Sequence, residues 1–326
     1  MNVELLSPAD FPAPVAVISG GWSKERDRAL LSGHAVMDSL ARQGVKTRWI
    51  DLKNRETLLS DLAGIGLAVL AIAGRGAEDG RLQGLLETLG IDYTGSGVLA
   101  SAAGMHKVIA KTIVRAAGVQ APASTVIEPT RGAAFEADRI ERLLGLPVII
   151  KPISEGGSIG LHTAHTAHDL LQAIRAAPPG HVMAERFHPG RPVSIGILQA
   201  PSGAPHVLPA LEAELPDAPD EVYSYEAKRG QTTCRYHCPA NLSADLEQAL
   251  HRQALTAHQA LGCHAYSRHD FIVADHGEVL WLEVNTLPGL SETGNLARMA
   301  AARELGYDQL IAHVVRSART DRKVQP

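Results

Sequence analysis

The alternation of short apolar runs with amphipathic segments limits the folds open to this chain. Val15–Ser19 has the pattern of a buried strand, and the Gly20-Gly21 pair that follows has that of a turn. Ser23 is then predicted to cap a helix whose apolar residues share one stripe. A second apolar run, Leu67–Ile72, precedes another helix of the same kind. Strands and helices that alternate in this way predict a parallel α/β layer, so the fold class is α/β.

The composition is that of a globular chain without a strong charge bias. The sequence has 326 residues, of which 45% are hydrophobic and 20% are charged, with a formal net charge of −4. This length can build two or three closely joined domains with a substantial core. Acidic and basic residues are mixed along the chain, so the concentrated basic face that non-specific nucleic-acid binding requires is not expected.

The N-terminal segment and the cysteines together predict a cytoplasmic protein. The first residues lack a basic region followed by an unbroken apolar core, which is the pattern of a signal peptide. No apolar run approaches the roughly 20 residues that cross a bilayer, so no membrane association is expected. The three cysteines are too few and too scattered for a disulfide framework, which favours a reducing compartment.

Three polar residues near the end of the chain could hold a metal ion. Asp270 is expected to open one strand, while Glu283 and Asn285 lie two residues apart on the next. Residues two apart on a strand point to the same face. Two carboxylates and an amide oxygen on one face form the hard-oxygen site that Mg²⁺ prefers. The same pattern also fits a solvated strand edge, and the neighbouring motifs favour the metal.

A lysine that ends an apolar strand precedes a glycine-rich segment. Lys151 closes the run PVIIK and is followed by SEGGSIG, in which Gly156, Gly157 and Gly160 can turn backbone N–H groups toward phosphate oxygens. The spacing matches neither a P-loop nor a dinucleotide-binding turn. A plain hairpin is the alternative to a phosphate clamp.

The segment MAERF has the pattern of a strand that lines a nucleotide-base pocket. Glu185 could bind the ribose or the edge of the base, and Phe187 could pack against the ring. The alternative is an ordinary strand end that carries a surface acid.

Six motifs occur in an order that resembles one known family. They are GGWSKER (20–26), AEDGRLQGLLETLGIDYTGSGVLASA (77–102), PVIIKPISEGGSIG (147–160), YSYEAK (223–228), CPANL (238–242) and LEVNTLPGL (282–290). Together they resemble the D-alanine:D-alanine ligase family of ATP-grasp enzymes, from about Val15 to Val315.

The resemblance implies a fold and an activity. It implies an ATP-grasp fold of three domains, residues 1–104, 105–189 and 190–326, with a closing loop over 212–239 and ATP between the central and C-terminal domains. The activity implied is ATP-dependent ligation of a carboxylate to an amine through an acyl phosphate, with release of ADP and phosphate. The cofactors implied are ATP and two Mg²⁺ ions, with Mn²⁺ as a substitute. Small amino-acid-like substrates and a homodimer are also implied.

The resemblance assigns roles to individual residues. The residues that would bind ATP are Lys107, Lys151, Ser158, Glu185, the Arg186 backbone, Phe187 and Lys228. Asp270, Glu283 and Asn285 would hold the Mg²⁺ ions. Glu25 would bind the ammonium of the first amino acid. Arg268 would stabilise the negative charge that develops when the amine attacks.

The chain departs from the family pattern mainly around the amino acids. Arg229 follows the loop lysine where the family has a tyrosine, and Gly157 takes the place of a serine. Ala73 stands where a histidine is expected, and Pro192 replaces a glutamate that would touch the ribose. Changes that spare the phosphate and metal residues suggest altered specificity with retained chemistry. Ala73 and Gly157 remove side-chain volume and Arg229 adds a positive charge, which suggests a first substrate that is larger than D-alanine or acidic.

The segment LPGLSETGNL (287–296) also departs from the family, in which SPGM is followed by a short Ser/His stretch. It is one residue longer here. Gly289 and Asn295 are the positions predicted to contact the second amino acid.

Several functions remain open from the sequence. One is the joining of two D-alanines for the cell wall, and another is a ligase for a larger or acidic amino acid in specialised metabolism. A hydroxyl nucleophile would give an ester instead of an amide. A nucleotide-binding relative without catalysis is a further alternative, which the retained Mg²⁺ residues and lysines disfavour.

Overall fold

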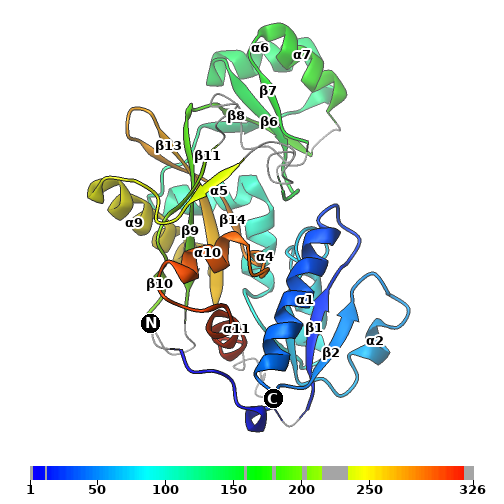
Figure 1. Cartoon of the computed structure of the whole chain (residues 1–326). Coiled ribbons are helices and arrows are strands. Elements are labelled where there is room, and N and C mark those ends of the chain that lie inside the picture. Colours follow the sequence, from blue (N-terminus) through cyan, green and yellow to red (C-terminus); the bar gives the residue numbers. More distant parts are fainter. Residues whose placement is uncertain are drawn as a thin grey trace.

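The computed structural model describes residues 3–11, 13–157, 160–177, 181–199, 204–214 and 234–318. Three β-sheets carry the fold (Figure 1): one from the N-terminal part of the chain, one from the middle and one from the C-terminal part. One sheet therefore lies in each of the three predicted domains, while the domain limits at residues 104 and 189 stay a prediction.

The first sheet is the parallel layer that the sequence predicts. Its strands follow the order β2-β1-β3-β4 and all its pairs are parallel. The strands are β1 (Val15–Ser19), β2 (Thr47–Asp51), β3 (Leu67–Leu70) and β4 (Asp92–Tyr93). The helices are α1 (Arg26–Arg42), α2 (Leu58–Asp61) and α3 (Arg81–Thr88). All five residues of β1 are buried, as expected for a strand that is covered on both faces.

The start of α1 differs from the prediction. The helix begins at Arg26 with Glu25 at the N-cap position, and no side chain caps it. The Ser23 hydroxyl instead donates to the Ala73 carbonyl at 3.1 Å. Ser23 therefore joins the turn after β1 to the turn after β3, and the predicted helix cap is wrong.

The second sheet is antiparallel, with strand order β5-β8-β6-β7. Its strands are β5 (Ser124–Val126), β6 (Val148–Pro152), β7 (His162–Ala164) and β8 (Val182–Arg186). Two helices, α6 (Ala133–Leu144) and α7 (Ala167–Ala176), pack on it. Figure 1 shows this unit at the top of the molecule. Strand β6 covers Val148–Pro152, whereas the sequence predicts a strand over the run PVIIK (147–151). The observed strand is therefore shifted by one residue.

The third sheet has the order β12-β11-β9-β13-β14, with β10 paired to β9. Its strands are β9 (Gly190–Leu198), β10 (His206–Val207), β11 (Leu211–Glu214), β12 (Arg235–His237), β13 (Tyr266–Ala274) and β14 (Val279–Asn285). The helices that follow or accompany it are α4 (Val98–Met105), α5 (Lys107–Ala116), α9 (Ala244–Ala260), α10 (Asn295–Ala301) and α11 (Tyr307–Arg316). Single 3₁₀ turns occupy Pro8–Asp10 and Pro129–Arg131.

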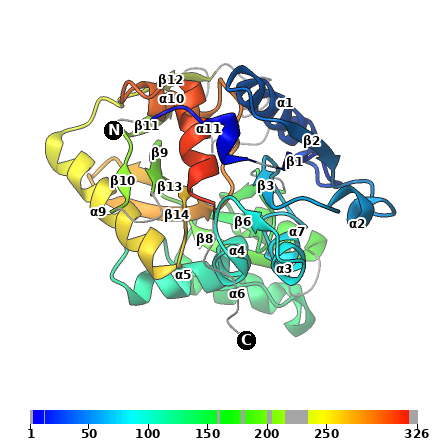
Figure 2. The same cartoon turned by 90° about the horizontal axis from the view of Figure 1, so that it is seen from below.

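Two helices, α5 and α11, pack beside the third sheet. Helix α5 packs on the third sheet, because Ala110 and Val114 share an apolar core with Ile195 and Trp281. Helix α11 runs between the first and third sheets (Figure 2), and its Leu310 belongs to the core that includes β1. The core that contains Leu310 also holds Leu198 of β9, so it joins the first and third sheets.

Strand β13 is longer than predicted. Asp270 lies in its middle, because the strand begins at Tyr266. The polar run before Asp270 hides the strand in the sequence. In the structure Ser267 and His269 are buried, and the Ser267 hydroxyl bonds the rings of both His258 and His269 at 2.8 and 3.0 Å. Polar residues that satisfy one another can thus occupy the inner face of a strand.

Candidate active site

One cavity of about 690 Å³ is lined by strands of the second and third sheets, by α1, and by the segment that follows β3 of the first sheet. Of the described residues that the sequence predicts for the site, all but Gly156 and Gly160 line it: Glu25, Lys107, Lys151, Gly157, Glu185, Arg186, Phe187, Arg268, Asp270, Glu283, Asn285, Gly289 and Asn295. Ser158, Lys228 and Arg229, and residues 215–233 of the predicted closing loop, lie outside the described residues. Ala73 and Pro192, two of the departures from the family pattern, also line the cavity.

Four residues lie as two directly opposed pairs on one face of strands β13 and β14. Asp270 lies opposite Glu283, and Arg268 lies opposite Asn285. Directly opposed residues of antiparallel strands share a face, as do residues two apart on one strand. The sequence therefore predicted the shared face of Asp270, Glu283 and Asn285 correctly, although it placed Asp270 at the strand start.

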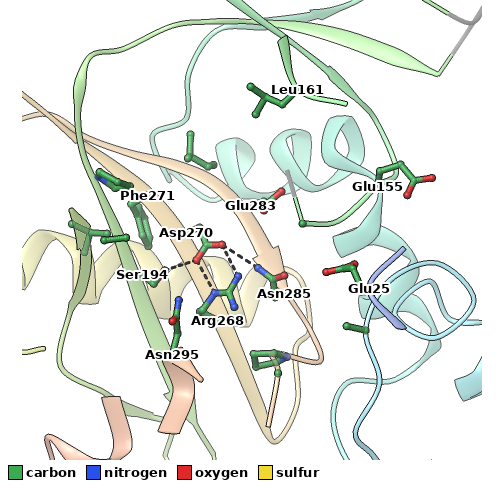
Figure 3. Close-up of a pocket in the computed structure, with 18 of the residues that line it drawn as sticks. Glu25, Glu155, Leu161, Ser194, Arg268, Asp270, Phe271, Glu283, Asn285 and Asn295 are labelled. Carbon is green, nitrogen blue, oxygen red and sulfur yellow. Dashed lines mark hydrogen bonds and ion pairs between the residues drawn. The ribbon is translucent and has the colours of Figure 1, made fainter. Parts of the chain in front are cut away.

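Asp270 is the centre of a hydrogen-bonded cluster (Figure 3). Arg268 donates to both carboxylate oxygens, through Nε at 2.8 Å and Nη2 at 2.9 Å. Ser194 on β9 donates to Oδ1 at 2.7 Å, and the Asn285 amide nitrogen donates to Oδ2 at 3.2 Å. The two-point contact fixes the plane of the guanidinium against the carboxylate. The arginine predicted to stabilise developing charge is therefore held in place by a predicted metal ligand.

Lys107 at the start of α5 reaches the same cluster. Its ammonium lies 3.1 Å from Glu283 Oε2 and donates to the Glu155 carbonyl at 2.6 Å. The lysine thus joins the glycine-rich segment after β6 to the β14 carboxylate. We call the charged side chains gathered here the charged end of the cavity: Lys107, Lys151, Glu185, Arg268, Asp270 and Glu283.

Glu185 on β8 lies between two lysines. Lys151 on β6 is 2.7 Å from Oε1, and Lys111 on α5 is 2.7 Å from Oε2. Burial alone would raise the pKa of Glu185, but the two ammonium charges outweigh it and lower the pKa to about 2. Burial lowers the pKa of Lys111 to about 8, against the opposing effect of Glu185.

The sequence interpretation missed Lys111. The signal was present, because Lys107, Lys111 and Val114 recur at helical spacing and all three are buried on α5. A lysine within an apolar stripe needs a buried partner. That partner, Glu185, lies 74 residues further along the sequence, beyond the reach of a local pattern.

The backbone around Phe187 is already hydrogen bonded. The Arg186 N–H donates to the Ala123 carbonyl at 2.9 Å, and the Phe187 N–H donates to the Pro147 carbonyl at 3.1 Å. The Arg186 side chain donates to the Leu144 carbonyl at 2.7 Å. A ligand at this segment would therefore meet carbonyl oxygens and the Phe187 ring, with these N–H groups engaged elsewhere.

Glu25, the residue before α1, lies over the glycine-rich segment. A Cβ on Gly156 would lie 2.6 Å from Glu25 Oε2, and one on Gly157 would lie 3.2 Å from Oε1. Gly157 also has φ +65°, which a side chain would strain. The space left by the missing serine at position 157 is therefore filled by the Glu25 carboxylate, and it does not enlarge the cavity there.

The segment after β14 is held by side chains that the sequence interpretation also missed. Buried Glu78 accepts from the Leu287 N–H at 3.2 Å and from the Gly74 N–H at 2.7 Å. Ser32 on α1 accepts from the Leu290 N–H at 3.2 Å, and Tyr307 donates to the Leu290 carbonyl at 2.5 Å. Glu25, Glu78, Ser32, Tyr307 and residues 287–290 are called the loop end of the cavity below.

Glu78 is a carboxyl group with an unusual environment. Burial raises its pKa to about 8, and the nearby Glu25 carboxylate adds to the effect. The two backbone N–H donors and the more distant Arg268 oppose the shift only in part. Glu78 is therefore protonated near neutral pH, which limits the negative charge next to Glu25.

The described part of the chain contains no helix that is both long and apolar enough to span a membrane.

Solved structures define the class of protein. D-alanine–D-alanine ligase from Bacillus anthracis, in complex with ATP, superposes with a TM-score of 0.80 at 27% identity, over 94% of this chain and 97% of that one. D-alanyl-alanine synthetase A from Vibrio cholerae has a TM-score of 0.82 at 21% identity, over 93% of this chain and 97% of that one. The fold is therefore ATP-grasp, and the class is ATP-dependent ligase.

Sequence comparisons give the family. The family description "D-ala D-ala ligase C-terminus" matches residues 113–316. D-alanine–D-alanine ligase from Trichlorobacter lovleyi is 38% identical over 93% of this chain and 94% of its own length. The ligase of that name from Chromohalobacter salexigens is 39% identical over 92% of this chain and 93% of its own. The chain belongs to the D-alanine–D-alanine ligase family, which confirms the resemblance read from its motifs.

Proposed function

We propose that this ligase joins two D-alanine molecules, using ATP to convert the carboxylate of the first into an acyl phosphate. The observation that carries the proposal is the convergence of the charged end and the loop end on one cavity. The names of the similar enzymes from Trichlorobacter lovleyi and Chromohalobacter salexigens support D-alanine as substrate.

ATP is proposed to lie between the second and third sheets. Lys151 and Lys107 carry positive charge into the cavity beside the glycine-rich segment, where phosphate oxygens would be stabilised. Glu185 and Phe187 lie on and just beyond β8, where the base would bind. Burial of the nucleotide between two sheets also strengthens each of these charge interactions.

Asp270, Glu283 and Asn285 fit a magnesium site. They supply two carboxylates and an amide oxygen on one face, which is the hard-oxygen set that Mg²⁺ prefers. The cations that now neutralise the two acids, Arg268 and Lys107, indicate a site built around negative charge. When bound, two Mg²⁺ ions, or Mn²⁺ in their place, would offset the charge on the ATP phosphates.

The first D-alanine is proposed to bind at the loop end. Glu25 would pair with its ammonium group, which places the carboxylate of the amino acid toward the charged end. Protonated Glu78 would leave Glu25 as the principal anion there. Arg268, oriented by Asp270, would stabilise the negative oxygen that forms when the second amine attacks.

The second D-alanine is proposed to lie against the segment after β14. Gly289 and Asn295 both line the cavity, and Asn295 is the first residue of α10. The Asn295 amide could bind the carboxylate of the second substrate. An acyl phosphate must be shielded from water, so we also propose closure by the predicted loop over 212–239 that carries Lys228 and Arg229. A cytoplasmic homodimer completes the proposal.

A larger or acidic first substrate is less well supported. The larger substrate depends on the volume freed at Ala73 and Gly157 and the acidic one on the charge of Arg229, but Glu25 fills the space beside Gly157. The names of the relatives also favour D-alanine.

The test is incubation with ATP, Mg²⁺ and a panel of D- and L-amino acids, read by phosphate release and product mass. D-alanine alone is expected to give the fastest phosphate release and a D-alanyl-D-alanine product. A larger or acidic amino acid that matches or exceeds D-alanine would refute the substrate. Phosphate release that is indifferent to added amino acid would refute the ligation.

A further inference from the structure

The two lysines that flank Glu185 differ in what they can reach. Lys151 lines the cavity, where its ammonium can meet a ligand. Lys111 is 1% exposed and is not among the cavity-lining residues. Its ammonium lies 3.4 Å from the Trp281 carbonyl oxygen and 5.6 Å from the centre of the Trp281 ring. Lys111 therefore faces the core behind the site, and it can act on a ligand only through Glu185.

Two lysines are needed to neutralise Glu185 because its carboxylate is buried. Glu185 is 3% exposed, and a buried carboxylate without a cation is strongly destabilised. In the structure both lysines neutralise it. If Lys151 turns to a phosphate oxygen when ATP binds, as the proposed function requires, Glu185 loses one of its two cations. Only Lys111 then remains against it.

We propose that Lys111 is a positioning residue, the permanent counterion that keeps Glu185 ionised and aligned as a hydrogen-bond acceptor when nucleotide draws Lys151 away. With Oε2 held by Lys111, Oε1 is the oxygen that Lys151 uncovers toward the cavity. A carboxylate oxygen accepts hydrogen bonds and cannot donate them.

This arrangement selects the base. An ionised Glu185 favours a purine that carries an amino group on the edge it presents, as adenine does, and repels one that carries a carbonyl there, as guanine does. A buried polar site rejects the wrong donor or acceptor strongly, because its own group is left unpaired. Lys111 thus contributes to the preference for ATP over GTP without touching either nucleotide. The inference depends on the proposed nucleotide site.

The experiment measures nucleotide binding by calorimetry, apart from turnover. Dissociation constants for ATP and GTP are determined with Mg²⁺ for the wild-type protein, Lys111→Met and Lys111→Arg. Lys111→Met keeps the length of the apolar stem and removes the charge, and is expected to weaken ATP binding about tenfold or more. The ratio of ATP to GTP affinity is expected to fall by a similar factor, while the KM for D-alanine changes less than about threefold. Lys111→Arg keeps the charge and should stay much closer to wild type.

Two controls separate charge from packing. Lys46→Met is the same substitution at an exposed lysine outside the cavity, and should leave both affinities unchanged. Glu185→Gln removes the carboxylate that Lys111 is proposed to serve. In that background, adding Lys111→Met should cost no further ATP affinity, because the two effects act through one pair.

Three results would count against a role for Lys111 as the counterion of Glu185. Wild-type affinities in Lys111→Met, an equal loss in Lys111→Arg, or a full further loss on adding Lys111→Met to Glu185→Gln would each overturn the inference. If Lys111→Met does not fold, the double variant Lys111→Met/Glu185→Gln, in which neither position is charged, is compared with Glu185→Gln alone, and a further loss is again contrary. Failure of the wild-type protein to bind ATP would instead remove the proposed function, before any variant is compared.

Discussion

The two ends of the cavity are held in place by different kinds of interaction. At the charged end, side chains of opposite charge pair directly: Lys151 with Glu185, Lys107 with Glu283, and Arg268 with Asp270. At the loop end, side chains hold backbone groups, as Glu78 and Tyr307 hold Leu287 and Leu290.

We therefore expect the charged end to carry out the reaction with ATP, and the loop end to select the amino acid. Cations and anions that pair without ligand can exchange partners when phosphate and metal arrive, so the charged end can respond to ATP. Backbone groups that are fixed by buried side chains hold one shape, which suits recognition of a small amino acid. Substitutions at the charged end should therefore lower turnover, and those at the loop end should mainly raise the KM for D-alanine.

Asp270→Ala should have the largest effect, because it removes a proposed metal ligand and frees Arg268 from its two-point contact. Phosphate release should fall by at least about a thousandfold, since a metal contributes several kcal/mol to such a reaction. Circular dichroism should still show a folded protein, because Asp270 faces the cavity and not the apolar core. Asp138→Ala, at an exposed site on α6, is the matched control. Full activity in Asp270→Ala would remove the metal assignment.

Gly156→Ala tests the loop end. The added Cβ would lie 2.6 Å from Glu25 Oε2 and would displace that carboxylate. The KM for the first D-alanine should rise by about tenfold, the cost of a disturbed charged contact. Gly66→Ala is the control, because its Cβ would meet nothing within 4 Å. A KM equal to that of wild type would show that Glu25 does not bind the amino acid.

The charged end could be predicted from the sequence because its chemistry follows local rules. A strand alternates its faces, so Glu283 and Asn285 could be paired by counting, and Lys151 is marked by the apolar run before it and the glycines after it. The parallel first sheet was likewise visible in the alternation of strands and helices. The resemblance to a known family then added Lys107, Arg268 and Glu25.

What the sequence could not predict depends on contacts between distant segments. Glu78 lies in the motif of residues 77–102, yet its role needs Leu287, more than 200 residues further along the chain. Lys111 needs Glu185, and the space beside Gly157 could be judged only once Glu25 was placed over it. A missing side chain suggested free volume, whereas tertiary packing had filled that volume with a neighbour.

Glu78→Gln should flatten the pH dependence of stability. The folded pKa of Glu78 is about 8, against an ordinary value of 4.5, so between these values the folded protein holds a proton that the unfolded chain has lost. The free energy of unfolding of the wild type therefore falls as pH rises, by up to about 1.4 kcal/mol per pH unit from this group. Urea unfolding between about pH 5 and pH 8 should show this slope, reduced in Glu78→Gln. Glu56→Gln, at an exposed site, should keep the wild-type slope, and identical slopes in all three proteins would contradict the prediction.

Tyr307→Phe should have the smallest effect and gives the sharpest comparison. It removes one hydroxyl, which donates to the Leu290 carbonyl at 2.5 Å, and should lower the free energy of unfolding by about 1 kcal/mol. Tyr93→Phe removes a similar hydroxyl, which donates to Glu87 at 2.8 Å, from the first sheet outside the cavity. Both variants should lose similar stability, but only Tyr307→Phe should raise the KM for D-alanine, by about twofold to threefold. An equal KM in the two variants would mean that the backbone at Leu290 does not shape the amino-acid site.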